Sequence, residues 1–157
     1  MQGGGLMFWG VLFSNGLCAL KEIEGTLTSD KYIDLLQNFG VPCIKLNYKN
    51  EFNFIQDNCP PHVSKATKNF LENQCFNTIE WPACSPDLNL MENMWKIISD
   101  EVYNGPQPKN KPDLRKRVHD ALLVINSTKR HVIKDLFTNY RSRLTTLLIK
   151  RGNIINN

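Results

Sequence analysis

The chain has 157 residues, of which 41% are hydrophobic and 22% are charged, and this composition suits a globular protein with a sizeable core. The proportions exclude a mostly disordered chain, and no apolar run approaches the roughly 18–20 residues that a membrane-spanning helix needs. Residues 1–5 contain no basic side chain, and the apolar stretch after them is short. We therefore expect neither a secretory signal nor a membrane partner.

The net charge is +4, and it is distributed unevenly along the chain. Residues 96–157 carry 13 Lys and Arg against 5 Asp and Glu, whereas residues 1–95 carry 6 against 10. Such a division fits a polyanionic partner for the basic part and a cation site in the acidic part. A solvated helical face explains the basic residues equally well, so charge alone does not decide between the two.

The cysteines are five in number and contain no C-x-x-C pair, which argues against a disulfide framework and against a tetrahedral zinc site. We predict scattered, buried, free thiols in an intracellular protein. They lie at Cys18, Cys43, Cys59, Cys75 and Cys84.

The first half of the chain predicts a β-hairpin followed by a helix. Residues 6–23 are rich in strand formers, and Ser14-Asn15-Gly16 supplies the turn between the two strands. Thr28 or Ser29 can cap the helix, and we expect Gly40-Val41-Pro42 to end it.

The middle of the chain predicts two short strands on either side of a helix. Residues 52–56 form the first strand, which Cys59-Pro60-Pro61 cannot continue because proline lacks the hydrogen-bond donor of the ladder. Ser64 caps the helix, and residues 76–81 form the second strand.

The last part of the chain predicts helices. Residues 89–102 are helical, residues 105–112 resemble a linker, and the helical pattern resumes from Asp113 to about residue 150. Together these elements predict an α/β fold in which helices flank a mixed sheet. We divide the chain into a core at residues 1–104 and a basic helical extension of the same domain at residues 105–157.

Two carboxylates are candidates for a metal site. Asp57 follows a buried strand, where ligands gather in α/β proteins, although an Asp-Asn pair also starts an Asx-type turn. Glu92 lies within or beside the apolar stripe of its helix, and a carboxylate in that place needs a partner or a cation. A capping box with Asn89 is the competing interpretation of Glu92. Two-metal phosphoryl transfer uses carboxylates from separate elements that converge on one point.

These carboxylates lie in motifs that resemble those of the mariner-like transposases of the Tc/mariner superfamily. Gln56-Asp57-Asn58, with Pro60 and His62, resembles the second catalytic-acid motif of that family. Between Asp57 and Glu92 lie 34 residues, the spacing of the branch whose third acid is Glu. The third-acid motif is matched by Trp81-Pro82, Ser85-Pro86-Asp87-Leu88-Asn89, Glu92-Asn93 and Trp95.

The resemblance implies a ribonuclease-H-like fold in which acids bind Mg²⁺ or Mn²⁺. It implies that Asp57 and Glu92 are catalytic metal ligands, and that Asn58 and His62 shape the metal shell or contact phosphate. The implied activity is the cleavage of DNA at transposon ends and the joining of the freed 3′-hydroxyl to target DNA. We expect DNA as the partner, no small-molecule cofactor, a possible homodimer and a nuclear location.

Some residues of the family pattern have no counterpart in this chain. The first acid, an Asp on the central first strand, is absent from the sequence, so we expect that strand to be missing and this chain alone to be inactive in DNA cleavage. Cys59 and Pro61 also depart from the usual second-acid loop.

A non-catalytic, transposon-derived nucleic-acid-binding module is the alternative function, and its phosphate contacts would come from basic residues. A standalone ribonuclease-H-like nuclease is disfavoured, since it needs the same missing acid. The basic residues that we expect to contact DNA are Lys109, Lys111, Arg115, Lys116, Arg117, Arg141 and Arg143.

Overall fold

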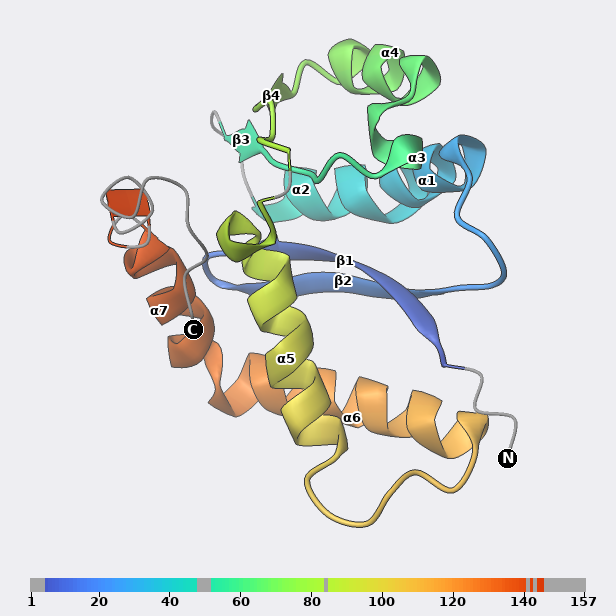
Figure 1. Ribbon diagram of the computed structural model, residues 1–157, viewed down its shortest axis with the longest axis vertical. Coiled ribbons are helices and arrows are strands. Elements are labelled where there is room, and N and C mark those ends of the chain that lie inside the picture. The colour runs from blue at the N-terminus through green and yellow to red at the C-terminus, as the bar shows by residue number, and fades with distance from the viewer. Residues whose placement is uncertain (1–4, 48–51, 84, 141, 143, 146–157) are drawn as a thin grey trace. The chain divides into compact units, whose positions relative to one another are not determined.

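The computed structural model shows two compact units, and each is described separately (Figure 1). One consists of residues 7–11 and 18–85 and is called the acid-loop unit, because it carries Asp57. The other consists of residues 1–6, 12–17 and 86–157 and is called the helical unit. The structure describes residues 5–47, 52–83, 85–140, 142 and 144–145. The predicted division at residue 105 falls inside the helical unit, and the domain assignment stays a prediction.

The predicted hairpin is confirmed: β1 (Met7–Phe13) and β2 (Gly16–Ile23) form a two-stranded sheet. The predicted helix is also confirmed, since α1 (Ser29–Leu35) is capped by Thr28, whose side chain accepts from the Lys31 N–H at 3.3 Å. Thr28 thereby satisfies one of the free donors at the helix start.

The prediction that this helix ends at Gly40-Val41-Pro42 is wrong. The helical path continues through a π-helical turn, η1 (Leu36–Gly40), into α2 (Val41–Asn47). Pro42 lies just after the π-helical turn, where the regular i to i−4 hydrogen-bond ladder of the helix is already interrupted, so its missing N–H is tolerated there. Gly40 is needed for packing, because a Cβ there would come within 3.3 Å of both the Leu36 and the Trp9 side chains.

The two predicted short strands are present at their predicted places but are shorter. β3 (Asn53–Phe54) pairs in parallel with β4 (Asn77–Thr78), and Asn53 lies opposite Asn77. The strands of the expected mixed sheet therefore form two separate two-stranded sheets among the described residues. Between β3 and β4 the chain forms α3 (Pro60–Val63), which was not predicted, and α4 (Lys65–Asn73), which Ser64 caps as predicted.

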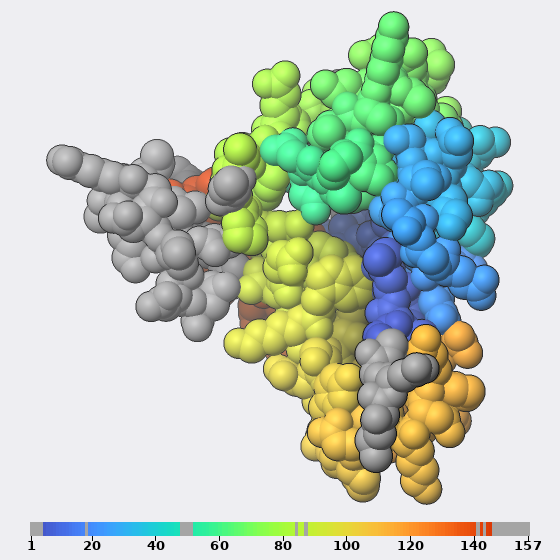
Figure 2. Space-filling model, turned by 45° about the vertical axis from the view of Figure 1, so that its right-hand side comes forward, coloured from blue at the N-terminus to red at the C-terminus, as the bar shows by residue number. Residues whose placement is uncertain are grey.

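The core of the acid-loop unit joins the hairpin to the helices. Five side chains are buried in it, each stabilising the fold by about 1.5–3 kcal/mol relative to an exposed position. Helices α3 and α4, green in Figure 2, contact α1, which is blue. Phe54 of β3 and Phe76 pack against the same core. The five buried side chains are Trp9, Ile23, Tyr32, Leu36 and Leu71.

The helical unit is built on α5 (Leu90–Val102), α6 (Lys111–Thr128) and α7 (Arg130–Thr138), and a 3-10 turn, η2 (Pro86–Leu88), precedes them. These helices confirm the helix predicted at residues 89–102 and the break after it. The helical segment predicted from Asp113 begins two residues earlier and is divided between α6 and α7, and residues 146–150 of that prediction lie outside the described residues. Helix α5 packs against α6 and α7. The buried residues of these helices are Met94, Ile98, Val102, Val118, Ala121, Ile125 and Ile133.

The hairpin end of the helical unit is attached to α6 through one side chain. Asn126 accepts from the Leu17 N–H at 3.1 Å and donates to the Leu17 carbonyl at 2.9 Å. The Asn126 amide thus satisfies the strand backbone as a neighbouring strand would. Gly16 permits this approach, because a Cβ there would lie 3.1 Å from the Asn126 Oδ1 atom.

The structure also bears on the predictions about membrane-spanning helices and about the cysteines. The described helices include none with the length and apolar character to cross a membrane. The prediction of buried, free thiols is wrong in part, because Cys43 is disulfide-bonded and Cys75 is exposed. Cys59 is free and half-buried.

Candidate metal centre

Asp57 lies where the chain leaves strand β3, as predicted. The pairing of β3 with β4 ends with the Ile79 N–H donating to the Phe54 carbonyl at 3.0 Å. The Asp57 carboxylate then accepts from the Cys59 N–H at 3.0 Å, so the Asx-type turn is also present. The turn and the proline at the start of α3 together set the direction of the loop after the strand.

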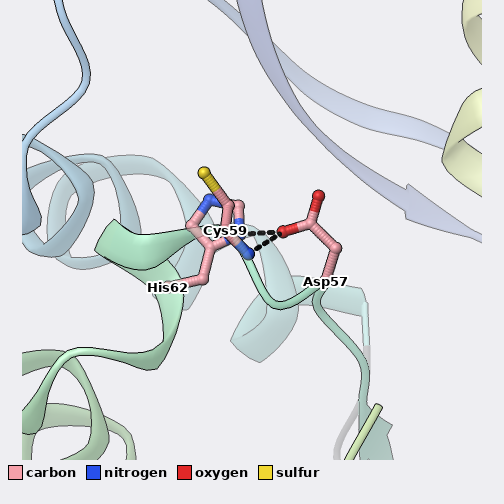
Figure 3. Close-up of side chains that lie close together, drawn as sticks. All are labelled: Asp57, Cys59 and His62. Atoms are coloured by element: carbon pink, nitrogen blue, oxygen red, sulfur yellow. Dashed lines mark hydrogen bonds and ion pairs between the residues drawn. The ribbon is translucent and has the colours of Figure 1, made fainter. Parts of the chain in front are cut away.

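His62 fixes the same oxygen of Asp57 from the other side (Figure 3). The His62 Nδ1 and Asp57 Oδ1 atoms are 2.6 Å apart, and since the carboxylate accepts, Nδ1–H is the donor. The His62 side chain is 15% exposed and that of Asp57 is 45% exposed. Both hydrogen bonds of the carboxylate use Oδ1, so Oδ2 has no hydrogen-bond partner among the described residues.

The His62 ring is itself held by the core of the acid-loop unit. It lies against the Tyr32 ring, with the ring centroids 4.0 Å apart. Gln56 closes the arrangement, because it accepts from the Tyr32 hydroxyl at 2.7 Å and donates to the His62 carbonyl at 2.8 Å. The His62 Nε2 atom is buried without a hydrogen-bond partner. The carboxylate of Asp57 is therefore oriented by contacts that reach α1.

Burial and the charge of Asp57 change the pKa of two neighbouring groups, the Tyr32 hydroxyl and the Cys59 thiol. Burial, with the negative charge of Asp57, raises the pKa of the Tyr32 hydroxyl well above its usual value. The same two causes, in the same order, raise the pKa of the Cys59 thiol. Both groups are therefore neutral at pH 7 in the metal-free protein.

Asn58 connects the Asp57 loop to the segment after β4. Its Nδ2 atom donates to the Trp81 carbonyl at 2.8 Å, and its side chain is exposed. The first residue of the predicted third-acid motif is thus attached to the second-acid motif within the acid-loop unit. A direct role of Asn58 at a metal stays a prediction.

Glu92 lies in the first turn of α5, in the helical unit. Asn89 is the N-cap, as predicted, and its side chain accepts from the Met91 N–H at 3.0 Å. The return bond of a capping box is not formed, because the Asn89 N–H donates to the Pro86 carbonyl at 2.9 Å. The cap therefore holds the start of the helix and leaves the Glu92 carboxylate without a capping partner.

The prediction that Glu92 lies in the apolar stripe or at its edge is wrong. Its side chain is exposed, and the buried stripe of α5 consists of Met94, Ile98 and Val102. Residues two apart on a helix are separated by about 200° around the axis, so Glu92 faces away from Met94. Glu92 and Asp57 belong to different units, and their convergence on one cation stays a prediction.

The predicted DNA-contacting residues differ in what their side chains already bind. Lys116 is exposed and lies 2.8 Å from the Asp120 carboxylate, which raises the pKa of Lys116. Arg117 is half-buried, and its Nη1 atom donates to the Pro106 carbonyl at 2.6 Å, so it attaches the linker before α6 to the helical unit. Lys109, Lys111 and Arg115 are exposed. Arg141 and Arg143 lie outside the described residues.

Sequence reasoning missed Tyr32 and Gln56 as parts of the centre. Tyr32 has the spacing of a core residue in α1, and its hydroxyl was the available signal, because a buried tyrosine needs a hydrogen-bond partner. Gln56 stood in the recognised motif, but only the fold brings it between Tyr32 and His62. The proximity of Cys59 to His62 also depended on the loop and on α3.

The acid loop lies within a segment that matches a known protein family. Residues 2–115 match the family described as DDE superfamily endonucleases. This match covers most of the chain, and the chain belongs to that family.

The relatives with similar sequences are transposases. The chain is 29% identical over 154 residues to the Tc3 transposase of Caenorhabditis elegans. The aligned segment covers 98% of this chain and 46% of that relative. It is 38% identical over 96 residues to the Tcb1 transposase of Caenorhabditis briggsae. Here the aligned segment covers 61% of this chain and 35% of that relative. The chain thus spans less than half the length of these curated relatives. The predicted resemblance to the Tc/mariner superfamily is confirmed.

Solved structures show the same fold at lower sequence identity. The Mos1 transposase catalytic domain with raltegravir and Mg matches with a TM-score of 0.83 and 14% identity, over 96% of this chain and 77% of that one. The Mos1 mariner paired-end complex with Mn matches with a TM-score of 0.83 and 15% identity, over 96% of this chain and 45% of that one. The predicted ribonuclease-H-like α/β fold is confirmed.

Proposed function

We propose that this chain is the catalytic core of a DNA transposase, and that Asp57 and Glu92 hold divalent cations for the cleavage and joining of DNA strands. The observation that carries the proposal is the state of Asp57. One of its carboxylate oxygens is fixed by two donors, whereas the other is available beside the end of β3. Family membership favours this function over a module that only binds nucleic acid.

The residues of the centre fit a hard divalent cation. Mg²⁺ and Mn²⁺ prefer carboxylate oxygens, and both Asp57 Oδ2 and the exposed Glu92 carboxylate offer them. Structures of the Mos1 catalytic domain are described with Mg and with Mn. Cations bound between such carboxylates activate the attacking oxygen and stabilise the leaving oxygen of a phosphodiester.

His62 acts as a positioning residue in this proposal. Its Nδ1–H holds Oδ1 of Asp57, which directs Oδ2 outward and limits rotation of the carboxylate. Tyr32 and Gln56 fix the ring and the backbone of His62 in turn. Loss of such an outer contact typically lowers metal affinity or activity about 10–100-fold.

The partner that we propose is DNA, bound through phosphate contacts of the exposed lysines before and on α6. Relatives are described as paired-end and strand-transfer complexes of Mos1. Replacing Lys111 with Ala should weaken binding to all DNA sequences alike and reduce the slope of binding against salt by about 1. Binding that ignores salt would contradict the phosphate contacts. We also propose that the protein acts in the nucleus and that it forms a homodimer. Sedimentation at increasing protein concentration tests the homodimer.

The test of the metal site is Mn²⁺ binding to the purified chain, measured by the loss of the free-ion paramagnetic resonance signal. We expect Asp57→Asn to weaken binding by at least about tenfold, because a carboxylate ligand is lost. Asp34→Asn is the matched control, since Asp34 is an exposed aspartate of the same unit that accepts from Asn38. Equal binding by both variants would overturn the assignment of Asp57.

Glu92 needs its own comparison because it lies in the other unit. Glu92→Gln should weaken Mn²⁺ binding, whereas Asp100→Asn, an exposed acid on the same helix, should not. A Glu92 variant that binds like the unmodified chain would remove Glu92 from the site and leave Asp57 in it.

A further inference from the structure

Cys59 lies beside the two residues that form the ion pair of the acid loop. One ligand atom each from Asp57, Cys59 and His62 can be chosen so that all three lie within 4.8 Å of one another (Figure 3). Cys59 is free and half-buried, so its sulfur is not used by a disulfide. The three residues come from one short segment, the turn after β3 and the first residues of α3.

We propose that these three residues form a second kind of metal site, which takes a thiophilic cation of the Zn²⁺ or Cd²⁺ class. The donor set is one sulfur, one imidazole nitrogen and one carboxylate oxygen, which is the combination that borderline and soft cations prefer. Mg²⁺ and Mn²⁺ gain little from the sulfur, because they prefer oxygen ligands. The cysteine therefore changes which ions the loop selects.

The ligand atoms need to move by about 1 Å to bind such an ion. In a tetrahedral zinc site the ligand atoms are about 3.3–3.6 Å apart, given the usual metal–ligand distances. The three ligand atoms already lie within 4.8 Å of one another, and His62 Nδ1 and Asp57 Oδ1, which are 2.6 Å apart, would separate to admit the ion. The residues of this loop are half-buried rather than packed in the core. Three protein ligands would leave the fourth position for solvent, toward which Asp57 is 45% exposed.

His62 is already aligned for this role. Its Nδ1 atom faces Asp57 Oδ1 at 2.6 Å, so a cation bound between them takes the place of the shared proton. The Nε2 atom has no hydrogen-bond partner, so no bond outside the cluster fixes which nitrogen of the ring carries the proton. The Tyr32 ring holds the imidazole in the same orientation with or without a cation.

The effect of this site on metal binding rests on the proposed function, because the thiophilic cation and the hard cation would both bind Asp57. A thiophilic cation held by Asp57, Cys59 and His62 uses the carboxylate that a hard cation needs for DNA cleavage. Zinc-class ions would therefore displace Mn²⁺ from Asp57. Replacing Cys59 with Ser should weaken this competition and leave Mn²⁺ binding itself intact.

The first test is differential alkylation of the unmodified chain, read peptide by peptide by mass spectrometry. Zn²⁺ should protect Cys59 strongly from N-ethylmaleimide, and Mg²⁺ should not. Cys75 is the internal control, because it is a second free cysteine among the described residues and is exposed outside the cluster. Equal labelling of Cys59 with and without Zn²⁺, or equal protection of Cys75, would overturn the proposal.

The second test separates a three-residue site from simple binding to a thiol. Cd²⁺ should produce a thiolate charge-transfer absorption that is lost in Cys59→Ser and unchanged in Cys75→Ser. His62→Ala should weaken Cd²⁺ binding by at least about tenfold while the absorption at saturation remains. Unchanged affinity in His62→Ala would show that the thiol binds alone and would overturn the site.

Failure of this inference is distinguishable from failure of the proposed function. If Zn²⁺ gives no protection but Asp57→Asn still weakens Mn²⁺ binding, only the thiophilic site is wrong. If Zn²⁺ protects Cys59 while Asp57→Asn leaves Mn²⁺ binding unchanged, the hard-cation assignment of Asp57 is wrong.

Discussion

The two acid-bearing regions of the molecule are built in opposite ways. Asp57 lies in a loop, where two donors hold one of its oxygens and where Tyr32 and Gln56 support His62 from behind. Glu92 lies on the first turn of α5, exposed, with only the helix and its Asn89 cap to position it.

The Asp57 carboxylate is therefore oriented before it binds a cation, whereas the Glu92 side chain keeps its conformational freedom. A carboxylate held by hydrogen bonds loses little conformational entropy when it binds a cation, and it presents the same oxygen each time. An exposed glutamate can swing toward a ligand but must be ordered on binding. We expect the two acids to differ in how much order each must gain when it binds a cation.

The largest effect is expected when the support behind the acid loop is removed. Tyr32 is buried, so Tyr32→Ala should lower the free energy of unfolding by about 3–5 kcal/mol and expose Cys59 to alkylation, because His62 loses its neighbour. Met94→Ala, in the core of the helical unit, should cost about 2–5 kcal/mol. Alkylation of Cys59 under native conditions distinguishes the two variants, because only Tyr32→Ala should accelerate it. Faster Cys59 labelling in Met94→Ala would contradict the expected difference between the two regions.

A smaller effect is expected at the junction of α3 and α4. The buried Thr67 hydroxyl lies 2.6 Å from the Pro61 carbonyl, to which it donates, so it fixes the short helix that carries His62. Thr67→Val should cost about 1–3 kcal/mol, because the carbonyl is left without this donor. Urea unfolding measures the loss, and Thr78→Val, at an exposed position of β4, is the control. A loss no greater than in the control would mean that the hydroxyl does not hold α3.

The support of Glu92 is expected to be weaker. Asn89→Ala removes the side-chain cap of α5 and should lower the free energy of unfolding by about 1 kcal/mol. Ser64→Ala, which removes the cap of α4, should cost a similar amount. Only the Ser64 change should also alter Cys59 alkylation, because Ser64 directly follows α3. Altered Cys59 labelling in Asn89→Ala would show that the two acid regions are coupled.

The smallest effect concerns pH and the start of α6. The Lys109 N–H donates to the Asp113 carboxylate, and this bond, with the nearby Arg117, lowers the pKa of Asp113. A depressed pKa stabilises the fold at neutral pH, and that stability is lost as the pH falls through the folded-state pKa. Asp113→Asn should therefore be less stable than the unmodified chain at pH 7, and the difference should shrink as the pH falls below the usual pKa of an aspartate. Urea unfolding at pH 7 and at acidic pH tests this, and a pH-independent difference would contradict it.

Local sequence signals predicted most of the secondary structure because caps and turns act within a few residues. Thr28, Ser64 and Asn89 each cap the helix that the sequence predicts, and Ser14-Asn15 forms the turn of the hairpin. The motif around Asp57 likewise predicted a carboxylate at the end of a strand. These are effects of short range, which one sequence contains in full.

Contacts between distant segments were not predictable in the same way. Which face of α5 is buried depends on α6 and α7, so the exposure of Glu92 could not follow from the spacing of apolar residues alone. The close packing of Gly40 against the Trp9 ring, which comes from β1, is likewise a contact between distant segments.

The sequence by itself thus determined most of the elements, the caps of α1, α4 and α5 and the two acid motifs, because these depend on residues close together in the chain. Only the tertiary structure decided how each acid is held. It placed the Tyr32 ring against the His62 ring, linked both residues to the Gln56 side chain and brought Cys59 close to Asp57 and His62. The physical reason is that packing and hydrogen bonds between segments far apart in the sequence select one arrangement among many that local preferences allow.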